Sequence, residues 1–262
     1  MKKSLYFFIF AVGLTFLFSS CTSSPPVDPA EANLTEASSQ VKIMGFYEEW
    51  DLIAGVIEND IFKVFIYDED LGWEEIPSSN LRLPLGYKDI FYMGDWYFGI
   101  IINDTVQIFE MNDDSEGTLY LLKSDYPGVA LPHGYQQVFG LGMIAVVVDD
   151  VLRFYNLDGE IPDTGSNLPR GYTDIFCLGF DYERDTPIIG IVVNGEVMFC
   201  GFDYNGRFWA EYYENRFKLP SGYRGVTGFD TGCLGVLVGD TLKIYIFDEE
   251  WTEMPEMSLN LR

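Results

Sequence analysis

The hydrophobic positions of this chain fall into a short phrase that recurs five times. Each copy has a small residue, three mostly aliphatic residues and then a pair drawn from Asn, Asp and Gly. The copies begin at Gly55, Gly99, Ala145, Gly190 and Gly235. Successive starts are 44, 46, 45 and 45 residues apart (99−55, 145−99, 190−145, 235−190). A nearly constant period of this length indicates a repeat architecture.

Each phrase predicts a β-hairpin. An aliphatic run rich in Val and Ile suits a buried strand, and an Asn-Asp or Asn-Gly pair accepts the positive φ angles of a tight hairpin turn. A second strand follows every turn, and it ends at an acidic or amide residue in all five copies. These second strands are predicted at residues 62–67, 106–111, 152–157, 197–202 and 242–247.

Two further strands flank each hairpin. A Leu-Pro-x-Gly-Tyr segment at residues 83–87, 131–135, 168–172 and 219–223 introduces a preceding strand, whereas residues 41–44 form that strand directly in the first copy. After the hairpin, turn residues lead to outer strands predicted at 73–77, 119–122, 208–212 and 251–255. The third copy offers only Glu160-Ile161-Pro162 for its outer strand.

Four strands in about 45 residues match one blade of a β-propeller. We therefore predict an all-β, five-bladed propeller over residues 41–262, with blades at about 41–82, 83–130, 131–167, 168–218 and 219–262. The last blade is expected to pack on the first and close the ring, with no strand exchanged between the ends of the chain. The alternative arrangement is an open β-solenoid.

The N-terminal residues predict a membrane address. A basic start at Lys2 and Lys3 precedes an apolar run of 14 residues at 5–18, which is too short to cross a bilayer and is typical of a secretory signal peptide. The ending Phe18-Ser19-Ser20-Cys21 resembles the lipobox of bacterial lipoproteins. That resemblance implies a signal peptide at 1–20 and lipidation of Cys21; an ordinary signal peptide with a chance cysteine is the alternative.

Residues 22–40 are rich in Ser, Thr, Pro, Ala and Glu and contain no aromatic residue. This composition predicts a disordered tether with a coil reach of roughly 25 Å. Because two lipid signals already give stable anchoring, a lipidated Cys21 would hold the propeller near the membrane as a partner. We expect a location in the bacterial cell envelope, at the outer membrane or cell surface rather than the inner membrane.

The chain is strongly acidic, with 16 basic and 41 acidic residues. Removing Lys2 and Lys3 with the signal peptide leaves 14 basic residues and a formal charge of −27 (14−41). Such a field repels phosphate backbones, so nucleic acid is excluded as a partner. The negative charge keeps the chain soluble, or it attracts a cationic partner or binds a divalent metal.

Three cysteines remain once Cys21 is assigned to the anchor. Cys177 and Cys200 are expected on the first and third strands of one blade, with Cα atoms about 9–10 Å apart, which is too far for a disulfide. We predict that both, and Cys233, are buried apolar thiols.

Candidate binding residues gather in the Leu-Pro-x-Gly-Tyr segments. In a propeller these segments and the turns between second and third strands share one face. The tyrosines Tyr87, Tyr135, Tyr172 and Tyr223 repeat, which favours a structural role, but they would also offer a ring of aromatic platforms for a sugar or a peptide. The variable positions, Leu85, His133, Arg170 and Ser221, would then set specificity, with His133 and Arg170 as candidate ligand contacts.

Catalytic groups are scarce. His133 is the only histidine, so neither a nucleophile–histidine site nor a zinc site is supported, and no metal or cofactor is predicted. Asp89 and Asp174 begin the inner strands of two blades and form a candidate carboxylate pair for glycoside hydrolysis. The turns at 68–72 and 203–206 weakly resemble calcium loops, but their residues are also ordinary turn formers.

The pattern over residues 41–262 resembles β-propeller repeat proteins, and the count of five resembles tachylectin-type lectins; WD dipeptides and Kelch double glycines are absent. The leading hypothesis is a non-enzymatic, lipid-anchored module that binds an unknown protein or glycan. The alternatives are a lectin-like carbohydrate-binding propeller and a glycoside hydrolase.

Overall fold

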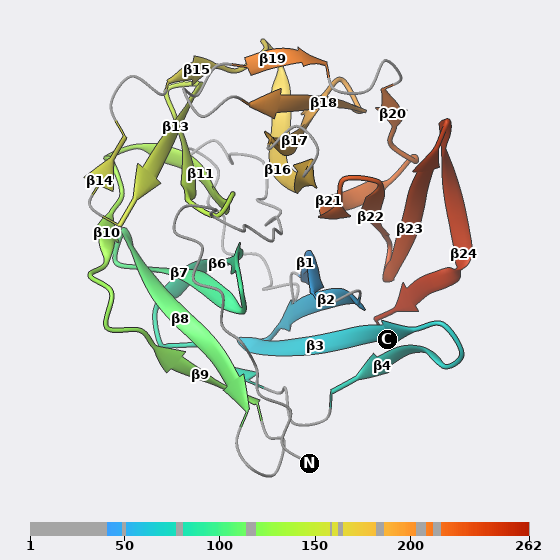
Figure 1. Ribbon diagram of the computed structural model, residues 1–262, viewed down its shortest axis with the longest axis horizontal. Helices are drawn as coiled ribbons and strands as arrows, with labels where there is room; N and C mark the ends of the chain where they lie inside the picture. Colours follow the sequence, from blue (N-terminus) through green and yellow to red (C-terminus); the bar gives the residue numbers. More distant parts are fainter. Residues whose placement is uncertain are drawn as a thin grey trace, which may run out of the picture.

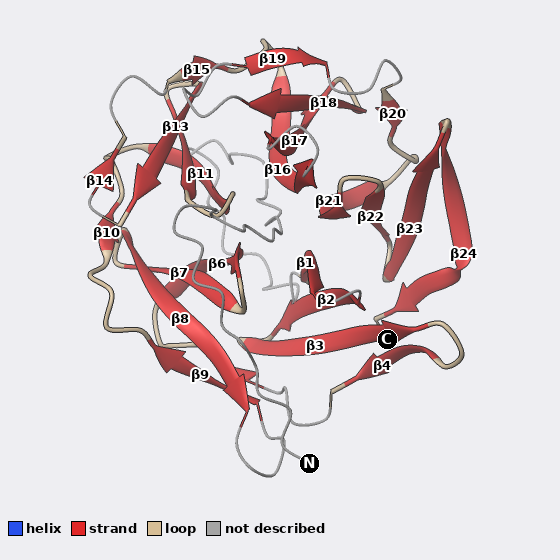
Figure 2. Ribbon diagram, viewed as in Figure 1, coloured by secondary structure: helices blue, strands red, loops and turns tan. Residues whose placement is uncertain are grey.

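The computed structural model describes residues 41–48, 51–76, 81–113, 119–157, 159–161, 165–181, 186–202, 208–211 and 216–261. The predicted signal peptide, Cys21 and the tether lie outside these residues, as does the turn at 203–206. The described residues form strands, turns and loops with no helix (Figure 2). No helix among them is long and apolar enough to cross a membrane.

Five antiparallel sheets follow one another along the chain, and we call them blades 1 to 5. Blade 1 contains β1 (Lys42–Glu48), β2 (Asp51–Glu58), β3 (Ile61–Asp68), β4 (Gly72–Glu75) and β5 (Leu81–Arg82). Blade 2 contains β6 (Tyr87–Gly94), β7 (Tyr97–Ile102), β8 (Thr105–Asp113), β9 (Leu119–Lys123) and β10 (Val129–Ala130). Blade 3 contains β11 (Tyr135–Gly140), β12 (Ile144–Val148), β13 (Val151–Asn156), β14 (Gly159–Glu160) and β15 (Ser166–Asn167).

The remaining two blades complete the ring. Blade 4 contains β16 (Tyr172–Asp181), β17 (Thr186–Val193), β18 (Glu196–Phe202), β19 (Phe208–Glu211) and β20 (Phe217–Lys218). Blade 5 contains β21 (Tyr223–Asp230), β22 (Cys233–Val238), β23 (Thr241–Asp248) and β24 (Glu250–Asn260). The sheets are arranged radially, with β1, β6, β11, β16 and β21 nearest the centre (Figure 1). The prediction of an all-β, five-bladed propeller is confirmed.

The structure adds one short strand to four of the blades. These two-residue strands, β5, β10, β15 and β20, pair with the beginning of the third strand of their own blade. Their Leu, Val, Ser or Phe is buried and the next residue is exposed. In blade 5 the long β24 serves both purposes, because it pairs with β23 at Trp251 and again at Leu259.

The ring closes between blades 5 and 1. The amide of Gly45 donates to Thr227 Oγ1 at 2.9 Å, and Trp73 Nε1 donates to the carbonyl oxygen of Met257 at 2.5 Å. Apolar side chains of both blades, including Ile43 and Phe229, share one buried cluster. The open β-solenoid is therefore wrong, and closure is achieved by packing and hydrogen bonds, with no strand exchanged between blades 5 and 1 among the described residues.

Glycines allow neighbouring innermost strands to approach each other closely. A Cβ on Gly140 would collide with the carbonyl oxygen of Tyr92, and one on Gly228 would collide with that of Cys177. A Cβ on Gly45 would lie 2.6 Å from the carbonyl oxygen of Gly228. Only glycine fits where two backbones approach this closely. The contacts fall at the boundaries of blades 2 and 3, 4 and 5, and 5 and 1.

Candidate ligand-binding face

The Pro-x-Gly-Tyr segments form four equivalent reverse turns. In each copy the Tyr amide donates to the Pro carbonyl oxygen at 3.2 or 3.3 Å, and the Gly has a φ of 76° to 78°. These features define a type II turn with x at its corner. The corner residues Leu85, His133, Arg170 and Ser221 are all exposed, and Leu85 is 100% exposed. The candidate specificity residues thus point away from the core.

The turns between second and third strands lie on the same face, which we call the turn face. Both central residues have positive φ in four of them: Asn59 and Asp60, Asn103 and Asp104, Asp149 and Asp150, Asn194 and Gly195. The Leu of each Leu-Pro-x-Gly-Tyr segment donates its amide to the carbonyl oxygen of the second of these residues at 2.8 to 3.0 Å. Leu261 makes the same bond to Asp240 at 2.9 Å.

Three of the four repeated tyrosines connect neighbouring blades through their hydroxyls. Tyr135 donates to Asp104 Oδ1 at 3.2 Å, and Tyr172 donates to Asp150 Oδ1 at 3.1 Å. Tyr87 makes the equivalent bond to Asp60. We call each contact a Tyr–Asp bridge. Partial burial and then the carboxylate raise the pKa of Tyr87 and of Tyr172 to about 12.

The fourth tyrosine, Tyr223, bonds no carboxylate in the described part of the chain. Gly195 stands where Asp60, Asp104 and Asp150 stand in the other turns, so Tyr223 faces a residue without a side chain. No side-chain hydrogen bond of Tyr223 is found among the described residues. In blade 5 the carboxylate is present at Asp240, where Arg224 Nη1 lies 3.6 Å from Oδ1.

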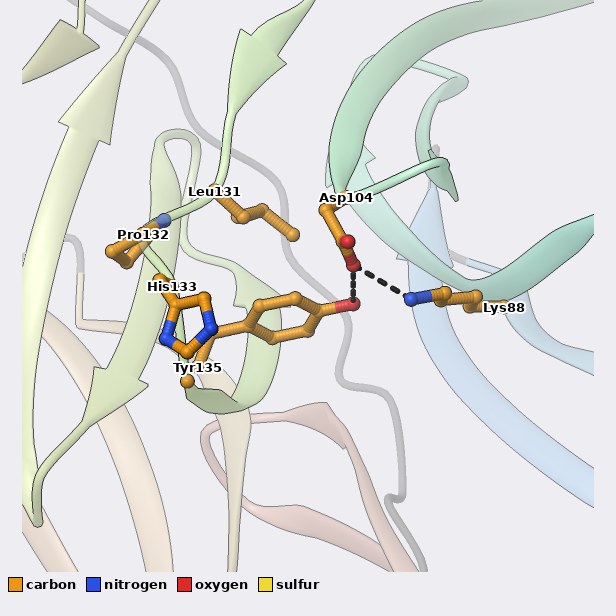
Figure 3. A pocket seen from close by; sticks show the side chains of 7 residues that line it. Lys88, Asp104, Leu131, Pro132, His133 and Tyr135 are labelled. Carbon is orange, nitrogen blue, oxygen red and sulfur yellow. Dashed lines mark hydrogen bonds and ion pairs between the residues drawn. The ribbon is translucent and has the colours of Figure 1, made fainter.

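A pocket of about 550 Å³ opens on the turn face where blade 2 meets blade 3. It is lined by the segment Leu131–Tyr135 together with Lys88 and Asp104 (Figure 3). Lys88 Nζ donates to Asp104 Oδ1 at 2.7 Å, and the Tyr135 hydroxyl donates to the same oxygen. In Figure 3 the Tyr135 hydroxyl points toward Asp104, and His133 lines the same pocket.

The electrostatics of the pocket centre on Asp104. The hydrogen bond from Lys88 and then that from Tyr135 lower the pKa of this carboxyl, and Asp104 raises the pKa of Lys88 in return. Burial is the main cause of the raised pKa of Tyr135. Both bonds go to Oδ1, and none of the described residues donates to Oδ2, which can therefore accept from a ligand. The pocket therefore offers an acceptor, the remaining ammonium donors of Lys88, an imidazole and an aromatic ring.

The neighbouring boundary of blades 3 and 4 has an equivalent Tyr–Asp bridge but a different side chain beside it. There Gln136 stands at the position of Lys88. Its Nε2 lies 3.4 Å from Asp150 Oδ1, while its Oε1 accepts from the Asp150 amide at 3.1 Å and from the Tyr172 hydroxyl at 3.3 Å. The Gln136 side chain thus hydrogen-bonds both members of this bridge, Asp150 and Tyr172. Lys88 and His133 therefore distinguish the pocket from the boundary of blades 3 and 4.

The candidate catalytic carboxylates make bonds between blades. Lys42 Nζ donates to Asp89 Oδ1, and Gln137 Nε2 donates to Asp174 Oδ1 at 2.7 Å. Asp174 and Gln137 are buried, with 7% and 6% exposure. The structure thus places Asp89 and Asp174 in separate polar bonds at two blade boundaries, an arrangement that favours a structural role.

Sequence reasoning missed Lys42, Lys88 and Asp104. Lys42 occupies the position of Asp89 because Met44 pairs with Gly55 as Phe91 pairs with Gly99. The first copy lacks the Leu-Pro-x-Gly-Tyr signal, so only strand register reveals this equivalence. Asp104 was part of a turn pair, and its hydrogen bond to Tyr135 spans 31 residues.

The buried cysteines and the Asp68 turn agree with the sequence predictions. Cys177, Cys200 and Cys233 are buried thiols that form no disulfide among the described residues, and Ile189 lies between the first two across the sheet, as predicted. Burial raises the pKa of Cys233 to about 12. Asp68 Oδ1 accepts from the amides of Asp70 and Leu71 at 2.8 and 2.9 Å, which is turn chemistry. No group of three or more His, Cys, Asp or Glu suited to a metal occurs in the described part of the chain.

Comparisons with known proteins do not assign the chain to a family. No family model matches it, and no curated protein matches it. Among solved structures it is similar to Hsv2 from Kluyvelomyces marxianus, with 11% identity, 85% of this chain and 95% of that chain covered, and a TM-score of 0.37. It is also similar to KlHsv2 with loop 6CD replaced by a Gly-Ser linker, with 10% identity, 84% and 95% coverage, and a TM-score of 0.34. The fold assignment rests on the sheet topology.

Proposed function

We propose that this chain is a non-enzymatic binding module of the bacterial cell envelope, anchored through a lipidated Cys21, and that its turn face binds a ligand. The observation that carries the binding site is the pocket formed by Lys88, Asp104, His133 and Tyr135. Its polar groups converge on a cavity at a blade boundary, and such cavities are common ligand sites. The bonds of Asp89 to Lys42 and of Asp174 to Gln137 support a structural role for these carboxylates over a catalytic one.

Crosslinking on intact cells tests the binding site. We expect the wild-type chain to capture a specific molecule, and we expect Lys88→Met and Asp104→Asn to reduce that capture at least tenfold, which corresponds to about 1.4 kcal/mol. Asp150→Asn is the matched control, because it perturbs a Tyr–Asp bridge outside the pocket. Equal capture by all four chains would remove the pocket from consideration.

Metabolic labelling with a fatty acid tests the anchor separately. We expect the label on the wild-type chain and its absence in Cys21→Ser. A labelled Cys21→Ser chain would show that the lipid, if present, is attached elsewhere. The result does not depend on the pocket, so the two parts of the proposal succeed or fail independently.

A carbohydrate ligand is the second candidate. The open Oδ2 of Asp104 beside the Tyr135 ring favours it, because hydroxyl donors and the apolar face of a sugar match a carboxylate and an aromatic ring. The tyrosines of the turn face would contribute platforms, including Tyr87, Tyr172 and Tyr223, with Arg170 as a further contact. A glycan array without binding, together with unchanged crosslinking by Tyr87→Ala plus Tyr172→Ala, would count against this candidate.

A further inference from the structure

The outer strand of blade 3, β14, has only two residues and begins later than the outer strands of blades 1, 2 and 5. In blades 1, 2 and 5 the third strand pairs with an outer-strand residue at one equivalent level: Tyr67 with Trp73, Met111 with Leu121, and Phe247 with Trp251. In blade 3, β14 begins opposite Asn156, so no residue of β14 pairs with Leu157 at that level. The cause is the short connection in the third copy.

The tryptophans of blades 1 and 5 fill space at a blade boundary. The Trp73 ring lies 5.4 Å from the Tyr67 ring and 6.1 Å from the ring of Phe229 in the preceding blade. Trp251 lies 5.3 Å from Phe247 and stacks at 5.0 Å on Phe199 of its preceding blade. An indole at this level therefore contacts both its own blade and its neighbour.

The corresponding space in blade 3 is a pocket of about 290 Å³. Met93, Met143, Ile144, Tyr155, Leu157 and Ile161 line it. Met93 lies four residues after Asp89, just as Phe229 lies four residues after the equivalent Gly225, and Leu157 is the equivalent of Tyr67. The lining thus repeats the surroundings of Trp73 without the indole.

This pocket opens on the face opposite the turn face, and the hairpin turns of that face are acidic. Their described residues include Asp51, Asp68, Glu69, Asp70, Asp95, Asp181, Asp230, Asp248, Glu249 and Glu250, and no Lys or Arg occurs in the described residues of these turns. Asp95 follows Met93 by two residues and is the nearest of them in sequence to the lining. A ligand approaching this pocket meets a negative field, which attracts basic groups.

We propose that this pocket binds an aromatic side chain of a partner protein, carried on a segment with flanking Lys or Arg residues. The aromatic ring takes the place that Trp73 and Trp251 take in blades 1 and 5. The basic residues match Asp95, which lies two residues from Met93, and the acidic turns elsewhere on the same face. The site is separate from the turn face and does not depend on the function proposed for that face.

A short peptide tests the proposal directly. The probe is N-acetyl-Lys-Trp-Lys-amide, titrated into the folded chain while the methionine ε-methyl signals are followed by NMR. We expect saturable shifts at Met93 and Met143 with a Kd of about 1 mM or tighter. We expect N-acetyl-Lys-Ala-Lys-amide to produce no such shifts and N-acetyl-Glu-Trp-Glu-amide to bind at least fivefold more weakly.

Two variants complete the test. Met143→Trp places an indole in the pocket from the chain itself, and we expect it to abolish binding of the Lys-Trp-Lys peptide. Leu71→Trp adds the same side chain at an exposed turn on the same face of blade 1, and we expect it to bind as the wild type does. The proposal is overturned if the wild type gives no shifts, if the alanine peptide binds equally, or if both variants behave alike. Each variant is compared only after its NMR spectrum shows that it is folded. If Met143→Trp does not fold, Ile161→Trp takes its place.

Discussion

Tyr172 of blade 4 donates its hydroxyl to Asp150 of blade 3 across 3.1 Å, and the Asp150 carbonyl oxygen accepts from the amide of Leu168. One turn residue therefore holds the next blade twice, once through its side chain and once through its backbone. The same pair of bonds occurs at Asp60 and Asp104. The Leu-Pro-x-Gly-Tyr segment is thus a connector between blades as well as a strand introducer.

Removing a Tyr–Asp bridge is expected to destabilise the ring. A hydrogen bond to a charged group contributes about 1.5–3 kcal/mol to stability. Because this pair is exposed, we expect Tyr172→Phe to lower the free energy of unfolding by an amount near or below the lower end of that range. Tyr223→Phe is the control, because Gly195 gives its hydroxyl no carboxylate. Urea denaturation measures the free energy of unfolding of both variants. A loss as large for Tyr223→Phe as for Tyr172→Phe would contradict the role of the bridge.

Gly195→Asp is expected to create the missing bridge to Tyr223. The equivalent Asp60, Asp104 and Asp150 already hold the required positive φ angles. A double-mutant cycle with Tyr223→Phe separates the new bond from any backbone strain, and we expect a coupling of about 0.5–1.5 kcal/mol. Zero coupling would mean that the two side chains do not meet.

The bond between Gln137 and Asp174 is buried, so its loss is expected to cost more. Gln137→Leu removes the side-chain amide that donates to Asp174 Oδ1 and to the Ile175 carbonyl oxygen, while the Ile175 amide still donates to Asp174 Oδ1 at 2.9 Å. A hydrogen bond to a charged group contributes about 1.5–3 kcal/mol, so we expect a loss in that range. Gln136→Leu, an exposed neighbour on the turn face, provides the comparison. The prediction fails if denaturation midpoints show the Gln136 variant to be the less stable of the two.

Gly140→Ala is expected to be severely destabilising. Its new methyl group would meet the Tyr92 backbone, which belongs to the adjacent innermost strand and cannot rotate away. Overpacking costs about 1–3 kcal/mol and more where backbone must move. At Gly165 a new Cβ would lie 3.3 Å from Val151 Cγ1 and meet no backbone. Thermal unfolding should therefore show a much smaller loss for Gly165→Ala.

Asp230 gives the expected pH dependence. Burial raises the pKa of its carboxyl, although the Thr231 amide hydrogen bond at 2.7 Å opposes that shift. A carboxyl whose pKa is higher in the folded than in the unfolded state favours folding at low pH, and this contribution is lost as the pH rises through the folded pKa. Asp230→Asn should therefore be more stable than the wild type at pH 7, with the difference shrinking towards pH 4. A difference that does not change with pH would exclude this explanation.

The repeats were readable in the sequence because each blade solves the same local problem. Val and Ile form continuous runs in the buried second strands, and pairs such as Asn59-Asp60 supply the positive φ angles of the hairpin turn. These choices act between residues that are close in the chain. The blade count, the hairpin positions and the burial of the three cysteines followed from them.

The tertiary structure alone decided what happens between blades. Lys42 reaches Asp89, and Gly45 bonds Thr227 over 182 residues, because ring closure sets which strands are neighbours. The pocket at Lys88 and Asp104 also lies where two blades meet. So does the apolar pocket of blade 3, at the position that Trp73 fills in blade 1. Local patterns encode each sheet, whereas the contacts that give the boundaries different chemistry depend on register and on the side chain that the next blade presents.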